Sequence, residues 1–274
     1  MKLAKLIAVG LALVSGMVNA EVTVINSGNK ASPASVLAMA YKNAVNGEWY
    51  QAKDCEDALR VFNTTKNAVL IYNSSLDFAA RNKNMNCTLQ GVTPQQIIFT
   101  GYTYMNVCRK PGSSADMNTN KTTLGMASMY AVNRHEKSFN TAGANIKLIP
   151  YGGSQEIVTA VRAGDVDLGW IGTGMAKKQG PNLDCIYSTN PSANNFLGKK
   201  LKLAIPDFKI DYVMYTNSTD GEILKKLRAA QSNKEFAEFL ETSDTSTNWN
   251  SKQRDLDEVN QYVKQMMTHW GETN

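Results

Sequence analysis

The sequence predicts an α/β fold in two lobes, each built around a mostly parallel sheet flanked by helices. Segments typical of a strand, a Gly/Ser/Asn turn and a helix repeat along the chain, as they do in parallel sheets connected by helices. This pattern stops at the polar, turn-rich stretch 109–121 and then starts again. The 274 residues are enough for two medium-sized domains. We therefore expect lobe 1 over residues 21–108 and 206–274, lobe 2 over 109–205, and a hinge near 105–112 and 203–212.

Lobe 1 is expected to begin with a short strand followed by a well-capped helix. Residues 21–26 alternate like a strand, and Ser32 and Pro33 then supply an N-cap and a favourable first helical position. The apolar run 68–72 predicts a buried strand. Three further elements follow in chain order: a helix from about residue 54, a short helix over 76–83 and a long strand over 97–108.

Lobe 2 is expected to repeat this order. A helix begins directly after Gly152, Gly153 and Ser154 and ends at Gly164. The other elements expected in lobe 2 are strands over 122–126, 145–151 and 166–172 and a helix over about 127–139. The remaining elements are strands over 201–205 and 211–217, a helix over 221–231, a helix that opens with the capping box 232–235, and a helix over 252–269.

The N-terminus predicts export. Lys2 and Lys5 precede a nine-residue apolar run, and the small residues that end at Ala20 suit signal-peptide cleavage. The run is too short to span a bilayer, which takes about 20 residues. We therefore expect residues 1–20 to be a cleaved signal peptide, Glu21 to be the mature start, and the protein to be periplasmic.

Charge and motifs argue against nucleic-acid binding and catalysis. Without the two lysines of the signal peptide, 27 basic residues stand against 24 acidic ones, a net charge of +3 with no Lys/Arg-rich block. His135 and His269 lie in no metal or hydrolase motif and are expected at the surface, and no phosphate-loop motif of NTPases occurs. The sequence therefore predicts no enzyme, no cofactor, no metal site and no nucleic-acid partner.

Four cysteines remain after processing, and in an oxidising compartment an even number suggests disulfides. Of the three possible pairings, we favour Cys55–Cys87 with Cys108–Cys185; free buried thiols are the alternative.

The expected strand-to-helix turns carry glycine, serine and asparagine at 27–32, 73–75, 125–128 and 152–154. Such turns present main-chain N–H groups at the positive end of a helix dipole, which suits an anion. In open α/β sheets they gather at the carboxyl ends of the strands. One such turn fits ordinary helix capping better, but four in two similar halves favour a binding site. The expected ligand-binding residues are Gly28, Asn29, Lys30, Ser32, Asn73, Ser74, Ser75, Met126, Ala127, Ser128, Tyr151, Gly152, Gly153, Asp167, Gly172 and Thr173.

Three of the residues considered have structural alternatives. Lys30 either adds a full positive charge to its turn or is a solvated surface lysine. Asp167 either caps a turn or holds a ligand loop, and Trp170 is expected in the core of its strand.

The segment IKLIPYGGSQEIVTAVRAGDVDLGWIG resembles a part of the tripartite tricarboxylate transporter solute receptors that reads roughly V-P-Y-K-G, a helix, then G-G-x-V-D. The stretches YNSSLDF, TTLGMASMYAV and QYVKQMMTHWG are also similar to segments of that family, so the resemblance covers most of residues 21–270. It implies a type II periplasmic binding protein that binds small carboxylates between two lobes.

Two departures from that family concern the ligand. The first turn contains Gly28, Asn29 and Lys30 where the family usually has Gly-Gly and a nearby Asp. The family often has a second Asp shortly after its V-D, whereas VDLGWIG contains none after Asp167; in this respect the chain is more similar to receptors that supply phosphonates or related oxyanions to ABC transporters.

The sequence thus predicts a monomeric, exported solute-binding protein that captures a small anionic solute, an organic carboxylate, for membrane transporter components. Three alternatives remain open: an ABC-type phosphonate or oxyanion receptor, a secreted two-lobed α/β enzyme, and a receptor-like module whose partner is a protein.

Overall fold

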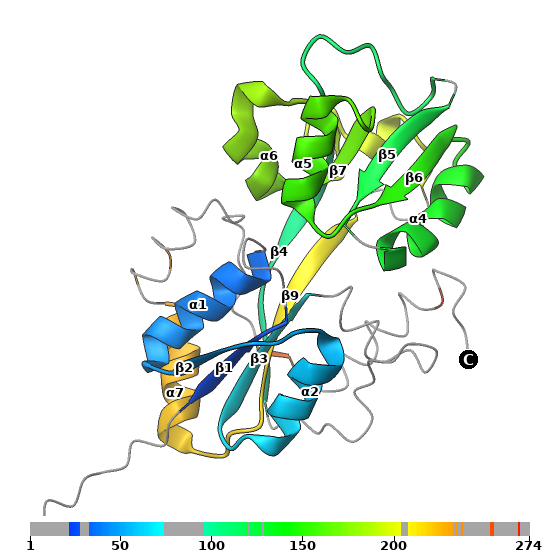
Figure 1. The fold of residues 1–274 in the computed structure, drawn as a ribbon. Coiled ribbons are helices and arrows are strands. Elements are labelled where there is room, and N and C mark those ends of the chain that lie inside the picture. The colour runs from blue at the N-terminus through cyan, green and yellow to red at the C-terminus, as the bar shows by residue number, and fades with distance from the viewer. Residues whose placement is uncertain are drawn as a thin grey trace, which may run out of the picture.

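The computed structural model describes residues 22–27, 33–73, 96–119, 121–127, 129–203 and 208–232, with isolated residues 234, 237, 253, 254 and 268 beyond them. The described chain forms two lobes, one above the other in Figure 1. The strands β4 (Gln96–Arg109) and β9 (Lys209–Thr216) run from one lobe into the other. Among the described residues, no helix combines the length and the apolar character that crossing a membrane requires.

The sheet of lobe 1 contains parallel strands with one antiparallel strand inserted among them. Its strands are β1 (Thr23–Asn26), β2 (Glu48–Gln51), β3 (Ala68–Asn73), β9 and the first part of β4. They lie in the order β2-β1-β3-β9-β4, and β9 is antiparallel to both of its neighbours.

Helices cover both faces of this sheet. They are α1 (Pro33–Val45), α2 (Cys55–Thr64) and α7 (Gly221–Ala230). Val69 and Ile71 of β3 pack in one hydrophobic cluster with α1 and α7, and Leu70, which is fully buried, points to the opposite face. The apolar run 68–72 therefore forms a strand whose residues 68–71 are buried on both faces, as the sequence predicts.

Lobe 2 repeats the same topology. Its strands are β5 (Thr122–Met126), β6 (Ile146–Pro150), β7 (Leu168–Gly172), β8 (Asp184–Ser188) and the last part of β4. They lie in the order β6-β5-β7-β4-β8, with β4 antiparallel to both of its neighbours. The two sheets therefore have the same strand order. In each, three parallel strands lie side by side in the chain order second, first, third; an antiparallel strand follows them, and a fourth parallel strand comes last.

The helices of lobe 2 are α4 (Met129–Thr141), α5 (Ser154–Ala163) and α6 (Thr173–Gln179), with short 3₁₀ turns at Gly180–Asn182 and Leu197–Lys199. Trp170, which is 3% exposed, lies in the cluster on the α4 side of the sheet, so the prediction that it belongs to the core is confirmed. Ile171 and Cys108 belong to the cluster on the α5 side.

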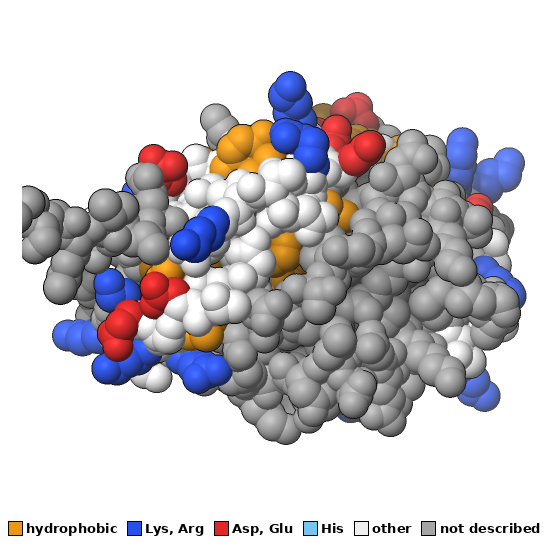
Figure 2. All heavy atoms as spheres, turned by 90° about the horizontal axis from the view of Figure 1, so that it is seen from below, with side chains coloured by type: hydrophobic (Ala, Val, Ile, Leu, Met, Phe, Trp, Pro, Cys, Tyr) orange, Lys and Arg blue, Asp and Glu red, His pale blue; other side chains and the backbone are white. Residues whose placement is uncertain are grey.

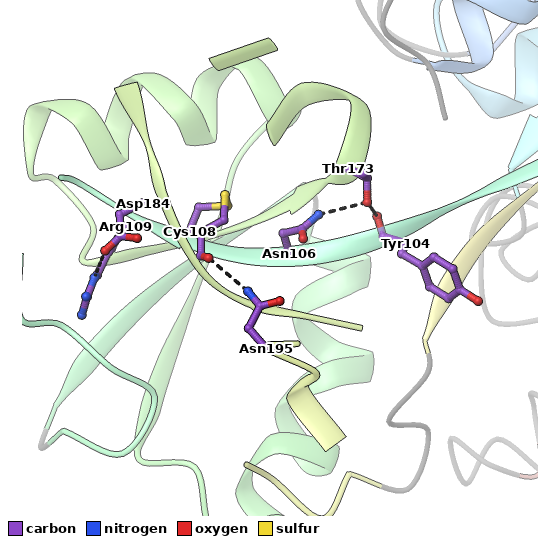
Figure 3. The surroundings of a disulfide bond; sticks show 8 residues. Tyr104, Asn106, Cys108, Arg109, Thr173, Asp184 and Asn195 are labelled. Carbon is purple, nitrogen blue, oxygen red and sulfur yellow. Dashed lines mark hydrogen bonds and ion pairs between the residues drawn. A yellow bond between two sulfur atoms is a disulfide. The ribbon is translucent and has the colours of Figure 1, made fainter. Parts of the chain in front are cut away.

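The disulfide Cys108–Cys185 is present and joins directly opposed residues of β4 and β8 (Figure 3). This confirms one of the two expected pairs. Cys87 and the side chain of Cys55 lie outside the described residues, so the second pair stays a prediction.

Several sequence expectations require correction. The strands β2 and β8 were not expected, and residues 201–203 of the expected strand 201–205 lie outside any strand. Gln253 and Arg254 pair antiparallel with β4, although the sequence suggests a helix there. His135 is only half-buried but is not a simple surface residue, because its ring packs edge-on against Phe208 at 4.8 Å between ring centroids.

The charges on the described part of the lower face are of both signs. Figure 2 shows lysine and arginine side chains interspersed with aspartate and glutamate on that part of the face. One ion pair, Asp57–Arg60 on α2, has its charged atoms 2.6 Å apart.

Candidate functional site

The strand directions make the carboxyl edges of the two sheets face each other. In lobe 1, β3 runs antiparallel to β9 and ends at Asn73, opposite Tyr212. In lobe 2, β7 runs antiparallel to β4 and ends at Gly172, opposite Met105. Because β4 and β9 pass between the lobes, β3 ends pointing toward lobe 2 and β7 ends pointing toward lobe 1 (Figure 1).

Between these two edges, β4 and β9 form a two-stranded connecting ribbon. Its pairs are Tyr102↔Asp211, Thr103↔Ile210 and Tyr104↔Lys209. Next to the ribbon on the lobe 1 side, Tyr212 of β9 pairs with the end of β3. Next to it on the lobe 2 side, Met105 of β4 pairs with the end of β7. The turns that follow the parallel strands of both lobes therefore flank the same short ribbon.

At the carboxyl edge of lobe 1, buried polar side chains join the strand ends to α1. Asn26 is fully buried, and its Nδ2 atom donates to Ser35 Oγ at 2.7 Å and to Gln51 Oε1 at 2.9 Å. Ser27 Oγ donates to the carbonyl of Ile71 at 3.2 Å. These bonds fix the first turn of α1 against the ends of β1, β2 and β3.

At the carboxyl edge of lobe 2, the end of β7 is bonded to β4 (Figure 3). Thr173 Oγ1 donates to the carbonyl of Tyr104 at 3.0 Å and accepts from Asn106 Nδ2 at 3.1 Å. A Cβ atom on Gly172 would lie 3.6 Å from the side chain of Thr103, which is an ordinary contact. The start of α6 is thus held directly beside the connecting ribbon.

The turn from β6 to α5 packs closely on β5. The N–H of Tyr151 donates to the carbonyl of Met126 at 2.8 Å, and the Tyr151 ring covers Gly125, where a Cβ atom would come within 3.1 Å of the ring. Burial, and secondarily the charge of Asp165, raises the pKa of the Tyr151 hydroxyl. Tyr151 is therefore a packing residue of this turn, which explains the glycine at position 125.

Asp167 does not join the other expected binding residues. It precedes the first residue of β7 and so lies at the amino edge of the sheet, opposite to Gly172. Its carboxylate accepts from the N–H and the hydroxyl of Thr123, both at 2.8 Å. Of its two sequence interpretations, the structure therefore supports a turn contact between β5 and β7 and not a ligand contact.

The structure brings the described remainder of the expected set to the two facing edges. Asn73, Met126, Ala127, Tyr151, Gly152, Gly153, Gly172 and Thr173 all lie at the carboxyl ends of their strands or directly after them. Gly28, Asn29, Lys30, Ser32, Ser74, Ser75, Ser128 and the side chain of Asn73 lie outside the described residues.

Sequence reasoning missed Asn26, Gln51 and Asn106. Asn26 and Asn106 are polar residues within apolar strand sequences, which is the signal that could have identified them; Gln51 ends β2, a strand of mixed polarity that gives no such signal. Among the described residues, no group of three or more His, Cys, Asp or Glu side chains could hold a metal ion. The polar groups described at these edges are hydroxyls, amides, main-chain groups and the carboxylate of Glu156.

No description of a protein family matches this sequence, and no curated protein is similar to it. Solved structures are similar in fold. A structure described as a periplasmic transporter aligns over 92% of this chain and 94% of its own, with a TM-score of 0.67 and 15% identity. The R. palustris protein Rpa4515, solved with adipate, covers 92% of this chain and 95% of its own, with a TM-score of 0.66 and 13% identity. The periplasmic binding protein BugD gives the same coverage, with a TM-score of 0.65 and 13% identity.

These likenesses show that the chain has the two-lobed fold of periplasmic binding proteins. The fold that the sequence resemblance implies is thereby confirmed.

Proposed function

We propose that the protein is an exported receptor that binds a small anionic solute, an organic carboxylate, between its lobes and delivers it to a transporter in the membrane. The observation that carries this proposal is the direction of the strands, which point the carboxyl edges of both sheets at one connecting ribbon. Ligands of open α/β sheets bind at such edges. The similar protein Rpa4515 was solved with adipate, which supports a carboxylate as the solute class.

Main-chain donors at these edges suit an anion. The first turn of a helix contains N–H groups without partners inside the helix, and the helix dipole makes this end positive. Helix α1 of lobe 1 and helix α4 of lobe 2 both begin just after the carboxyl ends of parallel strands. A carboxylate held between them would therefore meet favourable dipoles from two sides.

We further propose that the lobes rotate about the connecting ribbon when the solute binds. Two observations support the connecting ribbon as the place where the chain bends, near the hinge that the sequence predicts. Residues 105–109 pair with β7 on one side, and residues 106–109 also pair with β8 on the other, so this segment moves with lobe 2. Within the described chain, residues 102–104 and 209–211 pair only with each other. Bending a two-stranded ribbon disturbs fewer contacts than bending the middle of a sheet.

Thr189 joins both crossing segments to lobe 2 at the upper end of the ribbon. It is fully buried, its hydroxyl accepts from the N–H of Met105 at 2.9 Å, and it lies within hydrogen-bond distance of the carbonyls of Met105 and Phe208. The Thr189→Val substitution is therefore expected to lower the free energy of unfolding by about 1–3 kcal/mol, because buried polar groups lose their partner. Urea unfolding followed by circular dichroism measures this. Thr189→Ser, which keeps the hydroxyl, is the control, and equal stability of the two variants would contradict the assigned role.

The proposed function is tested by what the processed protein binds. Native mass spectrometry of protein purified from its exported fraction should show a co-purifying small anion and a chain that begins at Glu21. Thermal-shift screening of carboxylates, phosphonates and amino acids should then find a solute that stabilises the protein, by about 2.7 kcal/mol at 100 times its dissociation constant. If phosphonates stabilise it and carboxylates do not, the solute class is wrong. If no small anion stabilises it, the receptor function itself is contradicted.

A further inference from the structure

The turn between β6 and α5 already binds a carboxylate, and that carboxylate belongs to the chain itself. Glu156 lies in the first turn of α5, and its Oε2 atom accepts from the N–H of Gly152 at 2.8 Å. Gly153 is the residue before the helix, and no side chain caps it. The main-chain donor that the sequence assigns to a ligand is therefore bound to Glu156 in this structure.

The glycine at position 152 makes room for this carboxylate. A Cβ atom there would lie 2.7 Å from Oε1 and 3.1 Å from Oε2 of Glu156, closer than side chains normally approach. The three nearest atoms to that Cβ position all belong to the carboxylate group of Glu156. Gly152 and Glu156 thus form a unit in which the missing side chain of one residue accommodates the charged group of the other.

Glu156 also determines the formal charge of this edge of lobe 2. Residues 126–127, 150–156, 172–176 and 188–190 follow the parallel strands β5, β6, β7 and β8 or end them. Within these described stretches, Glu156 is the only side chain that carries a formal charge. The positive end of the α5 dipole is therefore opposed by a full negative charge, and the lysines of α6, Lys177 and Lys178, lie in the last turn of that helix.

We propose that Glu156 is a specificity-determining residue that excludes a second carboxylate from the lobe 2 side of the site. This inference rests on the proposed function and narrows its solute to a monocarboxylate whose other end carries a hydroxyl or ammonium donor. A solute carboxylate at this turn would have to displace Glu156 from Gly152 and remain beside its charge. Glu156 is exposed, so water weakens this repulsion while the lobes are apart, but closure around the solute removes that screening. A hydroxyl or ammonium group could instead donate to Glu156.

The test compares solutes of one length that differ only at one end. Adipate, 6-hydroxyhexanoate and 6-aminohexanoate form one set, and succinate, 4-hydroxybutanoate and 4-aminobutanoate form a shorter one. Isothermal titration calorimetry should show that the wild type binds the hydroxy or amino acid about tenfold or more tightly than the diacid of the same length. In Glu156→Gln, which can still accept from Gly152, we expect diacid affinity to rise about tenfold and amino-acid affinity to fall about tenfold.

Glu136→Gln is the matched control, because Glu136 is an exposed carboxylate on α4 of the same lobe. It should leave the preference of the wild type unchanged. A change of opposite sign for the diacid and the amino acid cannot arise from a general loss of folding, which would weaken both. If the wild type binds the diacids as tightly as Glu156→Gln does, the specificity role is refuted while the receptor function stands. If none of the six acids binds the wild type or either variant, both the proposed function as a carboxylate receptor and this inference are refuted.

Discussion

The Trp170→Ala substitution is expected to lower the free energy of unfolding by about 3–5 kcal/mol, the usual range for removing a large buried aromatic side chain. Trp170 is 3% exposed and lies in the centre of lobe 2 on β7. Its ring packs edge-on against Phe139 of α4, at 5.6 Å between centroids, and also contacts the rings of His135 and Phe208. Removing the indole would leave a cavity between the sheet, α4 and the residue that precedes β9.

Chemical denaturation in guanidinium, followed by circular dichroism, gives the change in stability. Trp170→Phe is the control, since it keeps an aromatic ring at the centre of the cluster and should lose clearly less stability than Trp170→Ala. A loss below about 1 kcal/mol for Trp170→Ala would show that the site collapses around the missing ring, contrary to the packing described above.

The double substitution of Cys108 and Cys185 by alanine is expected to destabilise the protein by about 2–5 kcal/mol. The bond links residues that are 77 positions apart in sequence, and losing such a link gives the unfolded chain more conformational freedom. It also joins β4, which connects the lobes, to the edge strand β8. Lobe 2 should therefore lose the pairing of β8 first.

Urea unfolding of the double variant, without a reducing agent, measures this effect and leaves Cys55 and Cys87 unchanged. The single variant Cys185→Ala is the control, because it breaks the same bond while it changes only the less buried of the two residues. It should lose nearly as much stability as the double variant. Wild-type stability in both variants would mean that the bond does not contribute to the folded state.

The sequence was sufficient for the buried parallel strands because their signals are local. Runs such as residues 68–72 are apolar on both faces, and the turns after them contain the glycines and serines that begin helices. The strands β2 and β8 lacked this signal. Both lie at the outer edge of a sheet and are mostly half-exposed or exposed, so their sequences are mixed in polarity. The shared use of β4 by two sheets depends on partners at least 59 residues away (Arg109 and Leu168), which no local pattern reveals.

The candidate site, like the fold, was predictable from the sequence only where the signal is local. The turns that could face a ligand were identified from glycine and serine positions, because turn chemistry is local. Asp167 was misplaced in the candidate set, because the sequence does not indicate which edge of the sheet an aspartate will occupy. The bond between Glu156 and Gly152 had a sequence signal that was overlooked: a glutamate three residues after the N-cap position commonly reaches back over the helix start.

The central claim is that turns of both lobes contact one solute across the connecting ribbon. Hydrogen–deuterium exchange with mass spectrometry, on the processed protein with and without a saturating solute from the thermal-shift screen, tests it most directly. We expect slower exchange in peptides after β1 and β3 of lobe 1 and, at the same solute concentration, in peptides after β5 and β7 of lobe 2. Protection confined to one lobe, or found at the amino edge beside Asp167 and Thr123, would contradict the claim.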